Sequence, residues 1–323
     1  MQTKVMRANL IRHVRENYLF NADDHVIVAL SGGADSLHLV TWLTDGNLPA
    51  DLQPQVSVVY VNHQLRDDAQ DEEQLVRNWL TDHAQQIEHS AVVPIEWDNR
   101  PTTGVEEVAR EKRYAILYEK AHEWGATKIL TAHHQDDQVE TIFFKLIRGG
   151  QISQLKGMQE QQVRDGIELV RPFLTLRKAD LHLLVDQPIT EFIEDSTNLD
   201  ESYARNKIRR TILPELRELN AGFDQHLLSE IAQFSALETI AQPLIDQAVS
   251  KMETGEFDWK QPEEQIVLYL QAWLAKAQLY SFKQRQLRQV IQLMRNQSVN
   301  AGEVKLNDET KIVRRGKQIL LKK

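Results

Sequence analysis

The sequence predicts an α/β protein, with a parallel, doubly wound sheet in a larger domain and a smaller, mainly helical C-terminal domain. Two observations support this class. In the first half, short Val- and Ile-rich runs alternate with longer amphipathic patterns, which is typical of a parallel sheet covered on both faces. From about Leu216 the β-rich runs stop and helical patterns follow one another.

Four predicted strands are each followed by a predicted helix. The strands share a short apolar pattern and are His25–Leu30, Gln55–Val61, Ala91–Glu96 and Lys128–Thr131. The helices share an amphipathic pattern and run to about Thr44, from Asp67 to about Gln86, from Val105 to Trp124 and from about Asp136 to Arg148. In such sheets ligands bind beyond the carboxyl ends of the strands, so residues leaving each strand are the first candidates for chemistry.

The second half carries Gln-rich helical patterns as far as Asn296. A β-like piece follows, with turn signals at Asn307-Asp308 and Gly316, and its predicted strands are Glu303–Leu306, Lys311–Arg315 and Gln318–Leu321. A length of 323 residues fits two domains. We predict an α/β domain over residues 1–215 and a smaller C-terminal domain, helical with a β-like piece, over 216–323.

Composition narrows the class of protein. Hydrophobic residues are 41% and charged residues 26%, as in ordinary soluble proteins. No apolar run approaches the roughly 20 residues of a membrane span, and the charged segment Met1–Phe20 does not resemble a secretory signal. We therefore expect a cytoplasmic protein without a membrane partner. The chain has no cysteine, which excludes disulfides, thiolate metal sites and cysteine nucleophiles within it.

Charge is segregated along the chain. The net charge is −9, yet Lys283–Arg295 holds four basic residues and no acid, and Lys305–Lys323 holds seven basic residues against two acids. A third basic group consists of Arg205, Lys207, Arg209 and Arg210. Because phosphates are bound by local patches, a nucleic-acid partner is compatible with the negative total.

A glycine-rich turn joins the first predicted strand to the first predicted helix. Its residues are Ser31, Gly32, Gly33, Ala34, Asp35 and Ser36. Two glycines let the backbone approach an anion closely, and the start of the helix supplies N–H groups and partial positive charge. The segment predicts a phosphate-binding loop rather than a plain capped turn. It is not a Walker A loop, because no Gly-Lys-Ser/Thr follows the glycines.

Acids and histidines follow the fourth predicted strand, in the segment Thr131–Thr141. Helical geometry places Asp136 and Asp137 next to Glu140 on one face. Such acids repel one another, so their grouping favours a cation, either Mg²⁺ carried by ATP or a substrate ammonium group. Helix capping would explain the two aspartates but not the glutamate. Zinc at His133 and its neighbouring histidine is disfavoured, because adjacent histidines do not readily point the same way.

Three further polar segments have a functional and an ordinary interpretation. The second strand is followed by a polar segment, Asn62, His63 and the residues up to 66. This segment either contacts the nucleotide or substrate or is an ordinary polar loop. Glu106, Arg110 and Arg113 fall at helical spacing, as a binding face or as a surface ion pair. The polar residues 194–198 lead into the basic residues 205–210, which suits a phosphate backbone or a solvated helix face.

Together these segments resemble tRNA(Ile)-lysidine synthetase, a family of the PP-loop ATP pyrophosphatase superfamily, whose members cleave ATP between its α and β phosphates. The resemblance covers most of residues 20–215. The motifs that carry it, in this order, are SGGADS, NHQLR, Glu106 with AREKRY, AHHQDDQVET, Arg171-Pro172 with Leu176-Arg177-Lys178, and EDSTN with RNKIRR and ILPEL. The region from Phe282 resembles the family's first C-terminal domain more loosely. Many members carry a further small domain, which is not found in this sequence.

The resemblance implies a PP-loop (Rossmann-like) fold and an ATP-dependent ligase. ATP and Mg²⁺ would adenylate C2 of the wobble cytidine of tRNA(Ile) with a CAU anticodon, and free L-lysine would displace AMP to form lysidine. The implied site residues are Ser31 to Ser36 for the phosphates with Asp35 on Mg²⁺, Asn62 and His63 for the nucleotide, Asp137 and Glu140 with Asp136 and His133 for lysine, Arg113 and Arg205 for the activated intermediate, and Arg209 and Arg210 for tRNA.

The sequence also leaves alternatives. Another PP-loop enzyme, such as a tRNA thiolase or an NAD or GMP synthetase, shares the loop. The missing cysteines disfavour a thiolase, and the basic segment 205–210 disfavours the small-molecule synthetases. A catalytically silent RNA-binding module is a third alternative, disfavoured by the intact loop and acids. A homodimer is left open as a partner.

Overall fold

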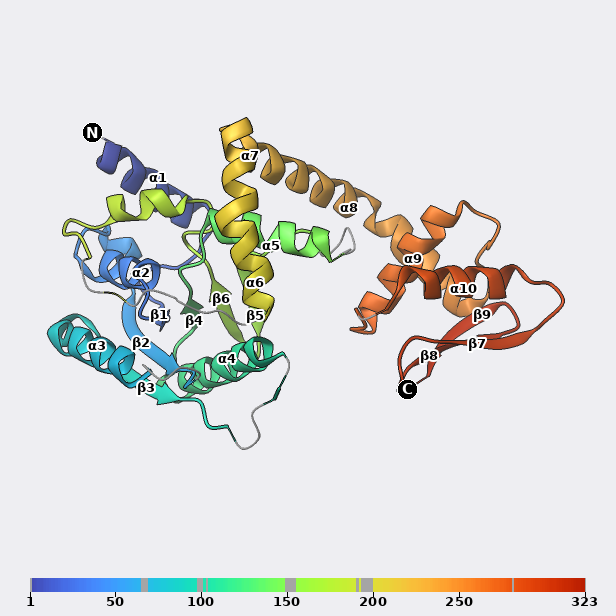
Figure 1. The fold of residues 1–323 in the computed structure, drawn as a ribbon, viewed down its shortest axis with the longest axis horizontal. Helices are drawn as coiled ribbons and strands as arrows, with labels where there is room; N and C mark the ends of the chain where they lie inside the picture. Colours follow the sequence, from blue (N-terminus) through green and yellow to red (C-terminus); the bar gives the residue numbers. More distant parts are fainter. Residues whose placement is uncertain are drawn as a thin grey trace. The chain divides into compact units, whose positions relative to one another are not determined.

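The computed structural model describes residues 2–64, 69–97, 101–102, 104–148, 155–189, 192, 200–280 and 282–322. A six-stranded sheet in the order β3-β2-β1-β4-β6-β5 organises the N-terminal part (Figure 1). Its strands are β1 (His25–Leu30), β2 (Gln55–Asn62), β3 (Ser90–Pro94), β4 (Lys128–Leu130), β5 (Gln161–Arg164) and β6 (Ile167–Val170). Neighbouring strands are parallel except β5 and β6. The predicted α/β class with a parallel sheet is confirmed.

The helices of this part follow the predicted alternation and continue beyond it. Those along the sheet are α1 (Gln2–Glu16), α2 (Ala34–Thr44), α3 (Ala69–Asp82), α4 (Val105–Trp124) and α5 (Gln135–Ile147). Those that follow are α6 (Asp200–Lys207), a π-helical turn (Ile208–Ile212), α7 (Leu213–Leu219) and α8 (Phe223–Thr254). Short 3₁₀ helices cover Ala50–Leu52, Ala84–Gln86 and Lys178–Leu184.

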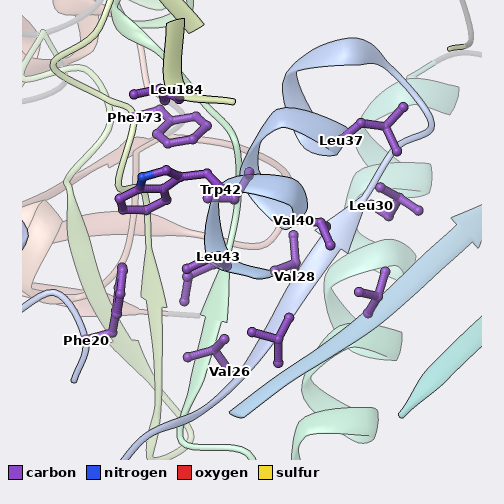
Figure 2. Close-up of a cluster of buried hydrophobic side chains, with 14 of the residues drawn as sticks. Phe20, Val26, Val28, Leu30, Leu37, Val40, Trp42, Leu43, Phe173 and Leu184 are labelled. Carbon is purple, nitrogen blue, oxygen red and sulfur yellow. The ribbon is translucent and has the colours of Figure 1, made fainter. Parts of the chain in front are cut away.

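Side-chain alternation along β1 shows which helices cover which face of the sheet. Val26 and Val28 belong to a buried cluster with residues of α1, α2 and α3, whereas Ile27 belongs to a second cluster with residues of α4. In the first cluster the ring of Trp42 lies between two phenylalanines, at centroid distances of 5.9 Å from Phe20 and 5.7 Å from Phe173 (Figure 2). The sheet is therefore covered on both faces, as expected of a doubly wound fold.

The strand order creates one topological switch point. The chain builds β1, β2 and β3 outward in one direction, and then crosses back through α4 to place β4 on the other side of β1. The loops that follow β1 and β4 consequently emerge next to each other at the carboxyl edge of the sheet. This is the place where open α/β sheets bind ligands.

Two elements of the N-terminal part were not anticipated. Helix α1 precedes the sheet, and β5 and β6 form a hairpin whose turn is Asp165-Gly166, at φ 52° and 78°. An Asp-Gly pair between two short strands is a strong hairpin signal, so the sequence did contain the information. Strand β3 is Ser90–Pro94 rather than the predicted Ala91–Glu96. The hairpin matters because β6 brings a further loop to the carboxyl edge.

The contacts divide the chain into two units, Met1–Ile231 and Ala232–Lys323. The predicted boundary near residue 215 marks the change to helices and stays a prediction. Besides the end of α8, the second unit contains α9 (Glu263–Lys276), α10 (Gln284–Arg295) and an antiparallel sheet of β7 (Ala301–Lys305), β8 (Lys311–Arg315) and β9 (Gln318–Lys322). None of the helices in the described part of the chain has the length and apolar character needed to cross a bilayer.

Candidate active site at the switch point

The loop after β1 is a closed turn at the start of α2. Gly32 adopts φ 78°, a conformation that favours glycine. The hydroxyl of Ser36 donates a hydrogen bond to the carbonyl of Gly33 at 2.9 Å and accepts one from the backbone N–H of Ser31 at 3.1 Å. The residues predicted to bind phosphate, Ser31 to Ser36, thus form one turn at a helix N-terminus, where N–H groups and the helix dipole favour an anion.

Asp35 connects this loop to two other segments at the same edge. Its Oδ2 atom lies 3.5 Å from Nε2 of His134 and 3.1 Å from Nζ of Lys178. Burial alone would raise the pKa of Asp35, but the hydrogen bond with His134 and the charge of Lys178 outweigh it and lower the pKa to about 2. Asp35 is therefore ionised at neutral pH and held between two nitrogen groups.

His134 is buried at the start of α5 with carboxylates around its ring. Its Nε2 atom is 3.4 Å from Oδ2 of Asp137, and its Nδ1 atom is 3.7 Å from Oδ2 of Asp136. Burial would lower the pKa of His134, yet the hydrogen bond with Asp35 and the charges of Asp137, Asp35 and Asp136 raise it. The imidazole therefore lies among three carboxylates that favour its charged form, an environment that sequence reasoning missed.

Asp136 is held by the protein's own groups. Its Oδ1 atom accepts a hydrogen bond from Nη2 of Arg217 at 2.8 Å, and its Oδ2 atom accepts one from the backbone N–H of Lys178 at 2.8 Å. Arg217 also pairs with the buried Asp224 at 2.9 Å. Asp136 thus ties α5 to α7 and to the segment after β6, which makes it a positioning group within this arrangement.

Glu140 is paired with an arginine from the basic segment. Its two carboxylate oxygens accept hydrogen bonds from Nε and Nη2 of Arg209 at 2.6 and 2.7 Å. Nη2 of Arg209 also lies 3.7 Å from Oδ1 of Asp137, whose other oxygen caps α5 through the backbone N–H of His134 at 2.9 Å. We call Asp35, Asp136, Asp137 and Glu140 the acid cluster. In this structure the cations it requires are supplied by the chain itself.

His133 faces away from the acids toward basic residues. Its Nδ1 atom lies 2.8 Å from the hydroxyl of Thr131. Burial, followed by the charges of Arg171 and Arg113, lowers the pKa of His133 well below its ordinary value. The ring is therefore neutral at physiological pH. The two adjacent histidines therefore have different partners.

Arg113, Tyr114, His133 and Arg171 form a second group, which we call the arginine cluster. The guanidinium carbon of Arg113 lies 5.4 Å from the centroid of the Tyr114 ring, and Arg171 directly follows β6. Within the described residues, Arg113 Nε, the Tyr114 hydroxyl and Arg171 Nε are buried without a hydrogen-bond partner. Buried donors without partners are rare, so this cluster is suited to an anionic or carbonyl-bearing ligand.

The remaining predicted residues lie around these two clusters. Asn62 is buried, where it donates to Glu73 at 2.9 Å and accepts from the backbone N–H of Gln64 at 2.9 Å, so its side chain supports the loop after β2. Arg205 and Arg210 are exposed, and the guanidinium of Arg205 lies 4.9 Å from the Phe144 ring centroid. The partly buried His63 accepts a hydrogen bond from the Trp97 indole at its carbonyl, at 2.9 Å. The predicted motif residues 65, 66 and 194–198 lie outside the described residues.

A resident metal site is not evident. In the part of the chain that the structure describes, no group of three or more His, Cys, Asp or Glu residues has a metal-binding arrangement. The arrangement fits a magnesium ion carried by nucleotide phosphates, which takes only one or two protein carboxylates. Asp35, in the predicted phosphate loop, is the carboxylate whose position would suit coordination of such an ion.

Comparison with known proteins identifies relatives of the chain. A family model described as the PP-loop domain matches residues 4–216. The tRNA(Ile)-lysidine synthases of Bacteroides thetaiotaomicron and Lactiplantibacillus plantarum are 32% and 34% identical to the chain, over 78% and 73% of its length. That of Enterococcus faecalis is 30% identical over 93% of the chain. The chain covers 57%, 52% and 66% of these three relatives, respectively.

A solved structure shares the fold. A U34-tRNA thiolase from Methanococcus maripaludis matches with a TM-score of 0.56 and 15% identity, over 72% of this chain and 79% of that chain. At this identity the likeness concerns the fold alone.

Proposed function

This chain belongs to the PP-loop domain family, and from that premise we propose that it is an ATP-dependent ligase that converts the wobble cytidine of tRNA(Ile) to lysidine in the cytoplasm. The observation that carries the proposal is the contact between Asp35 and His134 at the switch point. It joins the phosphate-binding loop to the start of α5, which carries the other three acids, so that an activated nucleotide and a cationic amine would meet at one edge of the sheet.

The loop Ser31–Ser36 would bind the phosphates of ATP. The start of α2 points N–H groups at this position, and Lys178 places an ammonium group 3.1 Å from Asp35. Asp35 would hold Mg²⁺ together with the phosphates, and the bound ion would neutralise charge on the departing pyrophosphate. Asn62 supports the loop after β2, and with His63 it would border the nucleotide.

The acid cluster would bind the ε-ammonium group of lysine. Asp137 and Glu140 are the two acids that share a single guanidinium in the structure, so their positions already suit one cation. Asp136 would act indirectly, because both its oxygens are engaged by Arg217 and the Lys178 backbone. Asp137 is the more exposed of the pair and is the better candidate to accept the proton that lysine must lose before attack.

The reaction would then proceed in two steps. The C2 oxygen of the cytidine attacks the α-phosphorus of ATP, and pyrophosphate leaves. The deprotonated amine of lysine attacks C2, the bond between C2 and the bridging oxygen breaks, and AMP leaves with that oxygen. Arg113 and Arg171 each have a buried donor with no hydrogen-bond partner among the described residues, and they would stabilise the negative charge of the α-phosphate attached to the adenylated base. His133, held neutral by burial and by these arginines, would border the base.

The tRNA backbone would lie against exposed basic residues. Arg205 and Arg210 are exposed next to the acid cluster's partner Arg209, on α6 and the π-helical turn. The target base sits in a single-stranded loop, so moving it into the site would require little unpairing. The absence of cysteine from these 323 residues favours lysine transfer over the sulfur chemistry of a thiolase.

Transfer of labelled lysine tests the proposal directly. With ATP, Mg²⁺ and full-length tRNA(Ile) bearing the CAU anticodon, radiolabelled lysine is expected to become attached to the anticodon base. The label should survive mild alkali, which removes aminoacyl esters. Label that fails to appear, or that appears equally without ATP, would contradict lysidine formation. AMP release stimulated by tRNA without lysine transfer would instead point to another PP-loop enzyme.

A further inference from the structure

The carboxylates assigned to the lysine ammonium already bind a cation of the chain. Arg209 donates two hydrogen bonds to Glu140, at 2.6 and 2.7 Å, and reaches Asp137 at 3.7 Å. An ammonium group can occupy this place only when the guanidinium leaves it. Arg209 therefore competes with any amine that binds these two acids.

Burial shows which partner would move. The side chain of Arg209 is 52% exposed, whereas that of Glu140 is 8% exposed. A buried carboxylate without a cation is strongly unfavourable, so Glu140 would exchange one cation for another and never lose both. The guanidinium reaches the acid from solvent, and its departure does not require the core to open.

The backbone around Arg209 is anchored on both sides. Arg209 lies in the π-helical turn Ile208–Ile212, and single π-helical turns are frequent at functional sites. Ile208 and Leu213 flank it, and they are buried in one cluster with Val139 and Phe144 of α5. The main chain is thus fixed against the helix that carries Glu140, while the long side chain extends from it to the acid.

We propose that Arg209 is a resident counter-ion that the ε-ammonium of lysine displaces from Glu140 and Asp137, and that the released guanidinium binds tRNA phosphate beside Arg205 and Arg210. The inference rests on the proposed function, because it takes lysine as the ligand. It also couples the two substrates. Lysine binding adds one cation to the exposed basic surface, and by reciprocity tRNA binding makes the acids more available to lysine.

Hydrogen exchange at the side-chain N–H of Arg209 can detect displacement of its guanidinium in the unaltered chain. In ¹⁵N-arginine NMR, saturating L-lysine is expected to speed hydrogen exchange of the Arg209 Nε–H several-fold. L-norleucine, which lacks the ammonium group, should not. Arg15 is a matched internal control, because it is also 52% exposed and bonds both oxygens of one carboxylate, Asp51, but that acid is 58% exposed. Unchanged or slower exchange at Arg209 with lysine bound would overturn the inference.

Variants test the competition independently. In equilibrium dialysis with labelled lysine, Arg209→Ala is expected to bind lysine about tenfold more tightly than the unaltered chain, because the competing cation is gone. Arg15→Ala should bind lysine as the unaltered chain does. Weaker lysine binding by Arg209→Ala would mean that Arg209 orients Glu140, and would overturn the inference. If this variant does not fold, the hydrogen exchange of Arg209 measured by NMR in the unaltered chain tests the inference by itself.

The two proposals fail in distinguishable ways. If lysine is transferred to tRNA but the hydrogen exchange of Arg209 is unchanged by lysine, the counter-ion role is contradicted and the ligase assignment is not. Absence of any lysine binding to the unaltered chain would overturn both.

Discussion

The acid cluster and the arginine cluster lie at the same sheet edge but differ in how far their polar groups are paired within the chain. Each acid has a cationic or N–H partner within the chain, as Glu140 has in Arg209 and Asp136 in Arg217. In the arginine cluster, by contrast, Arg113 and Arg171 each have a buried nitrogen that finds no partner among the residues the structure describes. The acids are thus satisfied before any ligand arrives, whereas the arginines are not.

This difference indicates how each region would meet its ligand. A ligand of the acid cluster has to replace a partner that is already present, so binding there is an exchange of cations. A ligand of the arginine cluster would instead supply acceptors to donors that have already paid the cost of desolvation. Preorganised donors of this kind are the groups that stabilise charge developing in a transition state.

Removal of Arg113 should therefore have the largest effect. Arg113→Gln is expected to lower the rate of AMP formation with tRNA by about 10²–10³-fold, as loss of a preorganised donor does. Its effect on the lysine KM should be small. Arg164→Gln is the control, because Arg164 is also near a tyrosine ring of α4, 5.3 Å from that of Tyr118, but is exposed. Equal rates for both variants would contradict a role for the arginine cluster in catalysis.

Changes in the phosphate loop should come next. Asp35→Ala and Ser36→Ala are each expected to lower ATP-dependent AMP release by about tenfold to hundredfold, since a hydrogen bond to a charged group contributes roughly 1.5–3 kcal/mol. Circular dichroism should show the fold intact. Asp45→Ala, at the opposite end of the same helix, provides the control. Unaltered AMP release in both loop variants would refute the phosphate-binding assignment.

The pKa of Asp35 predicts a stability change at acid pH. It is lowered from 3.8 to about 2, so the stabilisation is present above pH 3.8 and is lost as the pH falls through about 2. The free energy of unfolding should exceed that of Asp35→Asn by about 2 kcal/mol near pH 6, with the difference vanishing near pH 2. The raised pKa of His134 acts oppositely, since its contribution is present below 6.5 and is lost as pH rises through the folded value. Urea titrations at several pH values measure both, and a constant difference for Asp35→Asn would contradict the contact.

Loss of one acid should change the lysine requirement more modestly. Glu140→Gln is expected to raise the KM for lysine about tenfold while the KM for ATP stays nearly constant, because the amine loses one charge-assisted partner and the loop is untouched. Steady-state kinetics with each substrate varied in turn measures the two values. A rise confined to the KM for ATP would indicate that Glu140 contacts the nucleotide rather than lysine.

The smallest expected effect concerns tRNA. Arg210→Ala should reduce the slope of log affinity against log salt by roughly 0.7–0.9, the loss of one phosphate contact. For Arg209→Ala the same reduction is expected only when lysine is present, because Arg209 otherwise pairs with Glu140. Filter binding over a range of salt concentrations, with and without lysine, provides the measurement. An identical slope change in both conditions would show that Arg209 is not held by the acids.

Much of the site could be predicted because its parts are local. The turn from Ser31 to Ser36 lies between a strand and a helix, as expected, and Asp137 and Glu140 share one face of α5 because they are three residues apart. What could not be predicted is which cation each acid meets. The acid cluster's need for a cation was anticipated, but Mg²⁺ or a substrate amine was expected in the place where the structure has Arg209, Arg217 and Lys178.

The sequence by itself thus determined the βα alternation, the glycine-rich turn and the grouping of the acids, since periodicity and helix geometry are properties of neighbouring residues. Only the tertiary structure decided the partners. Glu140 and Arg209 are 69 residues apart, and Asp35 and Lys178 are 143 apart. The second pair depends on the strand order and on the β5–β6 hairpin, which brings the segment after β6 to the carboxyl edge, whereas the first depends on the packing of the π-helical turn against α5. No local pattern encodes contacts between residues so far apart in the chain.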